Sequence, residues 1–398
     1  MKGIVIIPCR GPQDSGEHLL RTLEHMNYPV PKNDHEIIIV DDNPTASVDP
    51  GVLKTRFSNT HVIHTSGGIG CAESRDFGVS RCPVELHDDD ILIFLDAHMN
   101  PNLYQDLYPG NFIDKIARHL EANRTRILCG KCYVMDAETW YADIHRPRAG
   151  YGATIEFHGP NEIFEPRWID TRPGKIPPYF KKFAHDPLAY RIPIIHGACY
   201  AMTYAVFRYL EGFSGLEEWG SDEIYLCLKA YIADRRTYQC GVMEDVRVGH
   251  LFSPSGPHPE RRLPLTFNKF RVIRELFPSH LVEPYIELVR MKESMGEQAY
   301  AEYLKKEPEI AARRRHWIDI FSEKNIETWF KKFEREFETP ALKKQKLASP
   351  FLKKFTKAVH KPREMKSLLV STARFAGVPK MKAMDAPPQN TPPWPIDP

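Results

Sequence analysis

The chain has no long hydrophobic run. None of its segments contains 18 consecutive apolar residues, so the sequence predicts no transmembrane helix. Residues 3–7 are apolar, but Pro8 follows them directly, and the run is too short for the apolar region of a signal peptide. We therefore expect a cytoplasmic protein without a cleaved leader.

A pattern of paired cysteines is also missing. The eight cysteines have irregular spacing, unlike the framework of a small disulfide-stabilised secreted domain. Cys129 and Cys132 form a single CxxC motif. In a strand, residues i and i+3 face opposite sides, so we expect no zinc site there. We interpret the cysteines as reduced residues of the core.

The chain as a whole lacks a strong charge of one sign, but its end does not. The 54 basic and 52 acidic residues give a formal net charge of +2. Residues 331–398 hold 15 basic residues against 6 acidic ones, so a basic appendage follows a mildly acidic body. Six prolines in residues 386–398 predict a disordered tail.

The sequence does contain an alternation of strand and helix patterns. Short apolar runs predict buried strands, and the amphipathic stretches between them predict helices. This order is typical of an α/β protein whose parallel sheet is covered by helices on both faces. The expected strands are residues 3–7, 35–40, 61–64, 91–95 and 126–134, and the expected helices are residues 17–26, 71–80 and 112–120.

The pattern weakens after residue 134. Residues 135–195 are rich in proline, glycine and aromatics, and we expect loops and a small antiparallel piece that form a lid over the carboxyl edge of the sheet. Further elements are expected at 192–202 (strand), 205–210 and 221–233 (helices), 236–248 (short strands) and 265–361 (helices). The expected domains are residues 1–260, a helical region at 261–385 and the tail at 386–398.

The strand at residues 91–95 is followed by Asp96-Ala97-His98. Residues i and i+2 of an extended segment point to the same face, so one divalent cation can take an oxygen from Asp96 and a nitrogen from His98. This ligand pair suits Mn²⁺ or Zn²⁺ better than Ca²⁺. Open α/β sheets bind substrates at the carboxyl ends of their strands. For such a motif alone, a solvated strand end is the alternative.

Other polar groups follow other expected strands. Asp41 and Asp42 can accept hydrogen bonds from ribose hydroxyls or a uracil N–H, or they can cap a loop. The glycine-rich turn at 67–70 follows the third strand rather than the first, which excludes a dinucleotide fingerprint. His250 ends a later strand, where it either completes a metal site or is structural.

Two acids and an aromatic residue precede the helix expected at 221–233. The segment reads Trp219-Gly-Ser-Asp222-Glu223. Acids in a first helical turn commonly complement the helix dipole. An aromatic residue, a glycine and paired acids equally suit the wall of a sugar pocket.

Taken in order, these motifs resemble the GT-A glycosyltransferases. They are most similar to the catalytic domain of the polypeptide N-acetylgalactosaminyltransferases and to their family-2 relatives. The resemblance covers roughly residues 1–255, and its most specific part is Phe-Leu-Asp96-Ala-His98 with a later Val-Gly-His250. The other matching segments are residues 4–8, 19–23, 37–42, 70–75, 196–198, 219–223 and 248–252.

The resemblance implies a Rossmann-like GT-A domain of the nucleotide-diphospho-sugar transferase type, followed by a helical region. It implies a Mn²⁺ ion held by Asp96, His98 and His250 that bridges the diphosphate of a nucleotide sugar, most simply a UDP-sugar. Asp222, with Glu223 beside it, is expected to be the catalytic carboxylate near the donor sugar or the acceptor. Contacts to the donor are expected from Pro8, Asp41, Asp42, Gly70, Arg75, His196, Gly197 and Trp219.

The sequence departs from the family pattern at several points. The family's Trp-Gly-Gly-Glu-Asn reads Trp219-Gly-Ser-Asp222-Glu223 here, and Ser253 stands where a basic residue is expected. We expect neither a lectin domain nor a membrane anchor. A secretory mucin-type role and the choice between retaining and inverting chemistry therefore stay open.

Two classes of function follow. The first is a metal-dependent, hexosyltransferase-like enzyme of a bacterium or a phage-infected cell. Its polymeric acceptor is either a modified base in DNA, held by the basic C-terminal region, or a peptide or cell-envelope glycan. The second is a degenerate GT-A domain that only binds nucleic acid or an anionic surface. The intact Asp96, His98 and His250 argue against degeneration.

Overall fold

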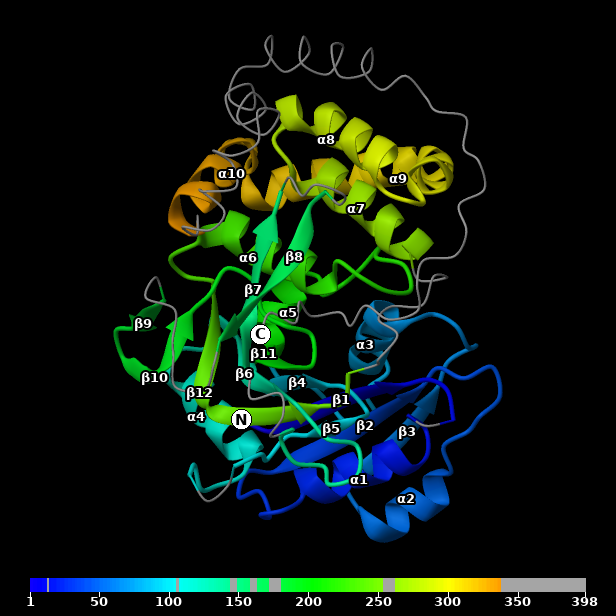
Figure 1. Cartoon of the computed structure of the whole chain (residues 1–398), viewed down its shortest axis with the longest axis vertical. Helices are drawn as coiled ribbons and strands as arrows, with labels where there is room; N and C mark the ends of the chain where they lie inside the picture. Colours follow the sequence, from blue (N-terminus) through cyan, green and yellow to red (C-terminus); the bar gives the residue numbers. More distant parts are fainter. Residues whose placement is uncertain are drawn as a thin grey trace. The chain divides into compact units, whose positions relative to one another are not determined.

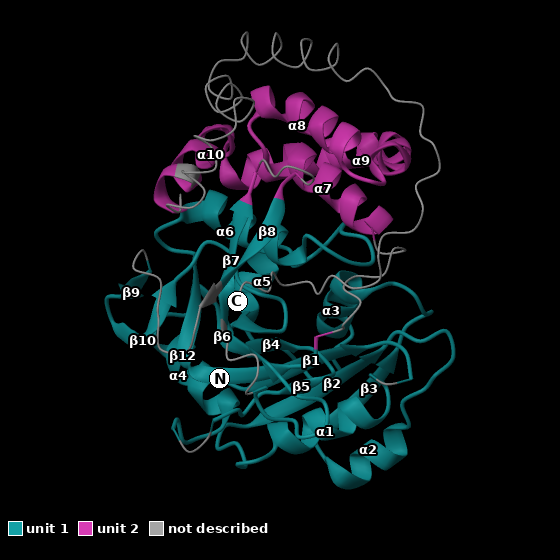
Figure 2. Cartoon of the chain, viewed as in Figure 1, with its two compact units in different colours: residues 1–155, 165–251 teal, residues 156–164, 252–398 magenta. Residues whose placement is uncertain are grey.

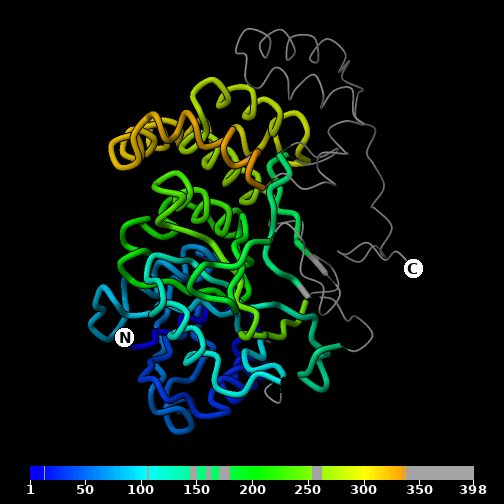
Figure 3. The backbone as a smooth tube through the Cα atoms, turned by 90° about the vertical axis from the view of Figure 1, so that its left-hand side faces the viewer, coloured from blue at the N-terminus to red at the C-terminus, as the bar shows by residue number. Residues whose placement is uncertain are grey.

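The chain folds into two compact units in the computed structural model, which describes residues 1–12, 14–104, 107–143, 149–157, 163–171, 180–252 and 262–337. The first unit contains Met1–Ile155 and Glu165–Leu251, and the second contains Glu156–Phe164 and the chain from Phe252 onward (Figure 2). Along the chain, the strands run from blue to green, and the helices of the second unit follow in yellow and orange (Figure 3). No helix of the described residues is long and apolar enough to cross a membrane.

Half of the sheet in the first unit is parallel. Strands β3, β2, β1 and β4 lie side by side in this order, and each neighbouring pair is parallel. The apolar side chains of β1, β2 and β4 are buried, as expected for parallel strands covered by helices. The carboxyl ends of these strands therefore meet at one edge. The strands are β1 Gly3–Cys9, β2 His35–Asp41, β3 Thr60–His64 and β4 Ile91–Leu95.

The other half of the sheet is mixed, so the expectation of a parallel sheet was wrong there. Strand β11 is antiparallel to both of its neighbours, β4 and β6, whereas β12 is parallel to β6. A parallel strand needs a crossover connection that returns the chain to the starting edge, and no helix of the described residues between β6 and β11 supplies one. The remaining strands are β5 Met99–Asn100, β6 Arg126–Val134, β7 Ala149–Glu156, β8 Glu165–Thr171, β9 Lys181–Phe183, β10 Asp186–Arg191, β11 Cys199–Thr203 and β12 Gln239–His250.

Helices cover the sheet through apolar stripes. Helix α1 buries Leu19, Leu23 and Met26, which recur at the helical period. Helix α3 approaches the sheet closely at Gly78, where a Cβ would lie 2.7 Å from Ile6. Figure 1 shows α3 and α1 on opposite sides of β1, β2 and β3. The helices of this unit are α1 Glu17–Met26, α2 Pro50–Arg56, α3 Cys71–Ser80, α4 Phe112–Ala122, α5 Tyr204–Tyr209 and α6 Asp222–Asp234.

The second unit is helical, as the pattern after residue 265 predicted. Its aromatic core includes Phe277, Trp317, Trp329 and Phe330, all of them buried. Arg314 is also buried and donates to the carbonyls of Arg274 and Glu275 in the last turn of α7, which satisfies acceptors at a helix C-terminus. The helices are α7 Arg262–Leu276, α8 Ser279–Lys292, α9 Gly296–Phe321 and α10 Glu323–Phe337. The expected helical pattern of residues 338–361 and the proline-rich tail lie outside the described residues.

Several local expectations differ from the structure. The strand expected at 192–202 begins only at Cys199. In place of the short strands expected at 236–248, there is a single long strand, β12, from Gln239 to His250. Helix α2 was not predicted, although Asp49 caps it and Pro50 occupies its first turn. The antiparallel piece expected within 135–195 is present as the pairing of β9 with β10. Much of the expected lid, at 144–148, 158–162 and 172–179, lies outside the described residues.

Candidate functional site

Backbone pairing brings two histidines together at the carboxyl edge of the sheet. Strand β4 ends at Leu95, and the chain then bends at Ala97 and His98. The sequence had suggested that the chain would stay extended through His98. Directly after the bend, β5 pairs antiparallel with the end of β12, with Met99 opposite His250. His98 therefore lies beside His250, although 152 residues separate them.

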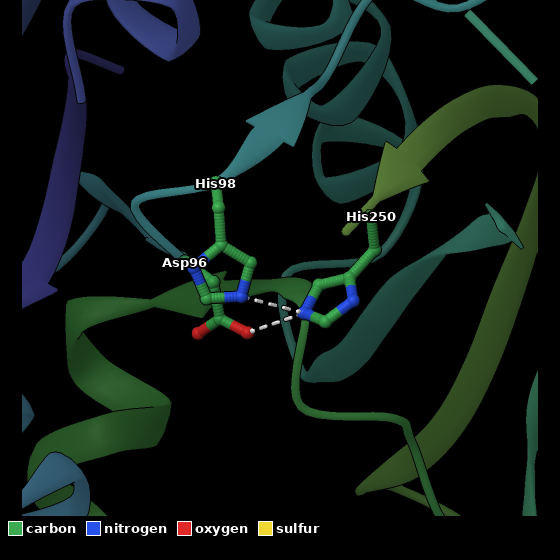
Figure 4. A group of neighbouring side chains, drawn as sticks. All are labelled: Asp96, His98 and His250. Atoms are coloured by element: carbon green, nitrogen blue, oxygen red, sulfur yellow. Dashed lines mark hydrogen bonds and ion pairs between the residues drawn. The ribbon is translucent and has the colours of Figure 1, made fainter. Parts of the chain in front are cut away.

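Asp96, His98 and His250 point toward one another (Figure 4). Their ligand atoms all lie within 4.8 Å of one another. The Nε2 atoms of the two histidines are 3.1 Å apart, and Nε2 of His250 is 3.3 Å from Oδ2 of Asp96. Among the histidine, cysteine, aspartate and glutamate side chains of the described residues, these three form the group whose spacing fits a metal ion.

The protonation states of Asp96 and His250 suit a metal ion. Burial opposes ionisation of Asp96, but the hydrogen bond from His250 and the charge of Arg75 outweigh it and lower the Asp96 pKa to about 2. Burial lowers the pKa of His250 below its usual value. Near neutral pH, the site thus offers an ionised carboxylate and a neutral imidazole, the forms that bind metals. This donor set fits a divalent cation such as Mn²⁺.

Arg75 lies behind the metal-ligand trio and connects it to α6. Its guanidinium group is 2.5 Å from Asp222 and 3.1 Å from Asp96, and it also donates to the carbonyl of Gly197 at 3.0 Å. Only 2% of Arg75 is exposed. These three contacts use the two terminal nitrogens of the guanidinium group, and the nucleotide contact that the family resemblance suggests for Arg75 stays a prediction. Through these contacts, Arg75 connects Asp96 to the first residue of α6.

The paired acids begin α6 in different surroundings. Asp222 is buried and bound to Arg75, whereas Glu223 is partly exposed. Burial, followed by the charge of Asp222, raises the pKa of Glu223 well above its usual range. Glu223 packs so closely under Gly197 that a Cβ there would lie 1.8 Å from its Oε1. The raised pKa of Glu223 favours the protonated form of its carboxyl group.

The turn before α6 has an unusual backbone. Gly220 and Ser221 both have positive φ angles, 95° and 65°. A positive φ is easy for glycine and unfavourable for serine. Ser221 stands where the family pattern has its second glycine, and its backbone keeps a conformation that suits glycine.

Asp41 is enclosed by the protein's own donors. It is fully buried, and its carboxylate accepts from the backbone N–H groups of Ser47 (2.8 Å) and Val48 (3.1 Å) and from the side chain of Asn43 (2.6 Å). Nδ1 of His64 lies 3.1 Å away. This environment matches the loop-capping alternative for Asp41.

Asp42 organises the glycine-rich turn. Its Oδ1 accepts from the hydroxyl of Thr65 (2.6 Å) and the N–H of Ile69 (3.0 Å), and its Oδ2 accepts from the N–H of Gly70 (2.9 Å). Gly70 has a φ of 82°, and a Cβ there would lie 2.2 Å from the backbone of Glu218. No side chain fits at position 70. Gly70 of the turn pairs with Glu218, the residue before Trp219, at this close distance.

The remaining expected donor contacts lie in two different environments. Pro8 is partly exposed at the carboxyl end of β1, and Trp219 is partly exposed next to Glu218. His196 is buried, and its Nε2 bonds the carbonyl of Gly130. Burial lowers the pKa of His196 to about 4, so the ring is neutral. His196 anchors the loop that carries Gly197 from inside the protein.

Two side chains that support the site were not found from the sequence. The hydroxyl of Thr22 donates to the carbonyl of Ala97 (2.8 Å) and accepts from the N–H of Met99 (2.9 Å), which fixes the bend around His98. Asp14 lies 3.0 Å from Nδ1 of His98. Thr22 lies in the matching segment 19–23 but was given no role there, and Asp14 lies in none of the matching segments. Only the three-dimensional arrangement shows what the two side chains contact.

The family model of glycosyl transferase family 2 matches residues 4–208, just over half of the chain. The chain belongs to glycosyl transferase family 2. The sequence-based resemblance to GT-A glycosyltransferases is thereby confirmed, as is the expectation of an α/β GT-A fold with helices in its C-terminal part. No curated protein matches the sequence in a direct comparison.

Solved structures similar to this family 2 glycosyltransferase include GalNAc-T7, crystallised with UDP, GalNAc and Mn²⁺. That match has a TM-score of 0.58 and 17% identity and covers 84% of this chain and 58% of the GalNAc-T7 chain. Residues 1–349 of S. aureus TarS with UDP-GlcNAc match at a TM-score of 0.46 and 16% identity, over 94% of this chain and 92% of that one. The chain thus spans less than two thirds of the GalNAc-T7 chain.

Proposed function

We propose that this protein transfers a sugar from a nucleotide sugar, a UDP-sugar, to an acceptor hydroxyl with the help of a divalent cation, Mn²⁺. The observation that carries the proposal is the convergence of Asp96, His98 and His250 at the carboxyl edge of the sheet. The GalNAc-T7 structure, with UDP, GalNAc and Mn²⁺, supports the choice of donor and metal. When bound, the cation acts as a Lewis acid that stabilises charge on the departing diphosphate.

The two acids of α6 have separate roles in this proposal. Asp222 pairs with Arg75 and holds the guanidinium group between the metal-ligand trio and α6. Glu223, whose pKa is raised by burial and by Asp222, accepts the proton of the acceptor hydroxyl in an inverting transfer. A retaining enzyme would use the same carboxylate to position the donor sugar.

The donor is held at the carboxyl ends of β1 and β2 and at the glycine-rich turn. Pro8 and Trp219 have exposed surface for the nucleotide and the sugar. Asp42 acts by shaping the turn, because its oxygens accept from the N–H groups of Ile69 and Gly70. Asp41 supports the neighbouring loop in the same indirect way.

Asp42→Ala should weaken UDP binding roughly tenfold, because the turn loses three hydrogen bonds and the partly buried N–H groups of Ile69 and Gly70 lose their acceptor. Calorimetry with UDP and Mn²⁺ measures this. Asp49→Ala is the matched control: it removes an exposed acid that caps α2 and should leave UDP affinity unchanged. Unchanged affinity in both Asp41→Ala and Asp42→Ala would limit these acids to a role in folding.

A polymeric acceptor remains the proposal, and a modified base in DNA is its first candidate because the chain ends in a basic region. On α10, Lys331 and Arg335 are exposed, whereas Phe333 is buried against Trp329. The phenylalanine therefore packs inside, and the cations face solvent. The remaining basic residues, from 338 onward, lie outside the described residues. A peptide or cell-envelope glycan is the alternative acceptor.

A degenerate GT-A domain that only binds nucleic acid or an anionic surface is the alternative of another class. A domain that only binds nucleic acid or an anionic surface would have no use for a set of metal ligands. The observed trio keeps its convergence, and the pKa of Asp96 keeps the carboxylate ionised. These features support the enzyme.

A screen of donors against acceptors tests the proposed function. With Mn²⁺, the full-length protein should release UDP slowly from its preferred UDP-sugar, and the true acceptor should accelerate this release at least tenfold. The acceptors are DNA with hydroxymethylated bases, a peptide and a cell-envelope glycan. No turnover of any nucleotide sugar would favour the binding protein instead.

The DNA arm of the screen needs its own control. A chain that ends at residue 337 keeps every residue of the site and loses most of the basic region. If DNA is the acceptor, binding should depend steeply on salt in the full-length protein and much less in the shortened one. Binding by the full-length protein that does not depend on salt would leave the glycan or peptide as the acceptor.

A further inference from the structure

One carboxylate beside the metal-ligand trio has no part in the proposed reaction. Asp14 belongs to the loop between β1 and α1, and its Oδ1 lies 3.0 Å from Nδ1 of His98. The other ring nitrogen of His98, Nε2, lies 3.1 Å from Nε2 of His250. We propose that Asp14 is a positioning residue that fixes the ring and the tautomer of the metal ligand His98.

The argument for the tautomer rests on hydrogen-bond chemistry. A neutral imidazole carries one N–H and one lone pair, and an ionised carboxylate can only accept. The bond to Asp14 therefore places the proton of His98 on Nδ1. The lone pair then lies on Nε2, the atom directed toward His250 and Asp96. Second carboxylates of this kind orient metal-binding histidines and raise their basicity.

Gly11 and Ser15, on either side of Asp14 in the chain, are held by hydrogen bonds. Oγ of Ser15 donates to the carbonyl of Gly11 at 2.8 Å, and the side chain of Asn43 bonds both residues, accepting from the N–H of Gly11 (2.7 Å) and donating to Ser15 (2.8 Å). Asn43 lies two residues after the end of β2, so these hydrogen bonds connect Gly11 and Ser15 to the edge of the sheet. These hydrogen bonds hold the backbone next to Asp14 and so help to keep its carboxylate beside His98.

The three proposed ligands are supported in different ways. Arg75 holds Asp96 through an ion pair, and the backbone pairing of β12 with β5 fixes the position of His250. Thr22 fixes the backbone of the bend that carries His98, but this does not set the rotation of the imidazole ring. Asp14 fixes that rotation through its contact with Nδ1.

This inference rests on the proposed metal site, and Mn²⁺ binding to the full-length protein tests it without any transfer reaction. Electron paramagnetic resonance of free Mn²⁺ gives the affinity in the absence of nucleotide. Asp14→Ala should weaken Mn²⁺ binding by roughly 10- to 100-fold. Asp14→Asn should lie between this variant and the wild type, because the amide oxygen still accepts from Nδ1–H but carries no charge.

Two further variants make the result specific. Glu17→Gln removes an acid from the same region, a 72% exposed side chain paired with Arg21, and should leave Mn²⁺ affinity unchanged. His98→Ala removes the ligand itself and should weaken binding at least as much as Asp14→Ala. Saturating Mn²⁺ should restore the kcat of Asp14→Ala, which would not occur if Asp14 only stabilised the fold.

The possible outcomes separate this inference from the proposed function. If Asp14→Ala binds Mn²⁺ as tightly as the wild type while His98→Ala does not, the role of Asp14 is overturned and the metal site stands. If His98→Ala also keeps wild-type affinity, both proposals fall. Should Asp14→Ala not fold, the comparison of Asp14→Asn with Glu17→Gln decides in the same way.

Discussion

Replacing Asp96 or His250 with alanine should abolish Mn²⁺-dependent sugar transfer while the protein stays folded. Each substitution removes one of the three side chains that converge at the edge of the sheet. A Lewis acid at a departing diphosphate contributes several kcal/mol, and about 4 kcal/mol corresponds to a roughly 10³-fold loss of rate. The measurement is release of UDP from the preferred donor, with circular dichroism to follow folding.

Folding should survive because each side chain is partly exposed, 21% for Asp96 and 12% for His250. Arg75 also keeps its bond to Asp222 when Asp96 is removed. His61→Ala is the matched control, because it removes a partly exposed histidine of β3 that pairs with Glu36 outside the site. EDTA should abolish transfer reversibly. Full activity of either variant, or of the wild type in EDTA, would contradict the metal proposal.

The local elements of the fold could be predicted from the sequence because each one depends on nearby residues. The bounds of α3, β4 and β6 match the expected ones, since each apolar or amphipathic run ends at polar or turn-forming residues. The sequence also identified the candidate metal ligands, which are Asp96, His98 and His250. Metal ligands are recognised by their chemistry, and their chemistry is visible in the sequence.

The pairing of distant segments could not be predicted. The two-residue strand β5 is too short to give a periodic signal, yet its pairing with β12 brings His98 beside His250. The direction of β11 depends on where the chain returns after the long excursion from β6. These features follow from the packing of the whole sheet, which the local pattern does not encode.

Arg75 is the clearest case of a role that the sequence did not reveal. Its partner Asp222 is 147 residues away, and no spacing rule connects the two. A buried guanidinium group requires acceptors, because burying an unpaired charge is costly. In the folded protein it finds them in Asp222, Asp96 and the carbonyl of Gly197. These contacts with distant residues could not be read from the sequence, and the donor contact expected of Arg75 stays a prediction.

Glu223→Gln should lower kcat by roughly 10²–10⁴-fold with little change in the affinity for UDP. Glutamine keeps the shape of the side chain beside Gly197 but cannot accept the proton of an acceptor hydroxyl. The sequence pointed first to Asp222 for this role. The structure gives Asp222 to Arg75 and leaves Glu223 partly exposed with a raised pKa. Steady-state kinetics and calorimetry with UDP measure the two effects.

The matched variant is Asp222→Asn, which keeps the shape and removes the charge. Its kcat should fall less than that of Glu223→Gln, and its melting temperature should fall more, because buried Arg75 loses an ionised partner. The reverse ranking in kcat would return the role of base to Asp222. If the product keeps the anomeric configuration of the donor, neither acid is the base, and the carboxylate positions the sugar.

The pH dependence gives an independent test of the same assignment. Burial and the charge of Asp222 raise the pKa of Glu223, so in the wild type Glu223 loses its proton, and kcat rises, only as the pH climbs through that raised value. Asp222→Asn removes the negative charge that holds the proton on Glu223. The rising limb of its pH–kcat profile should therefore move to lower pH, by about one unit if the charge contributes about 1.4 kcal/mol. A limb that stays in place in Asp222→Asn, or that persists in Glu223→Gln, would mean that another group accepts the proton.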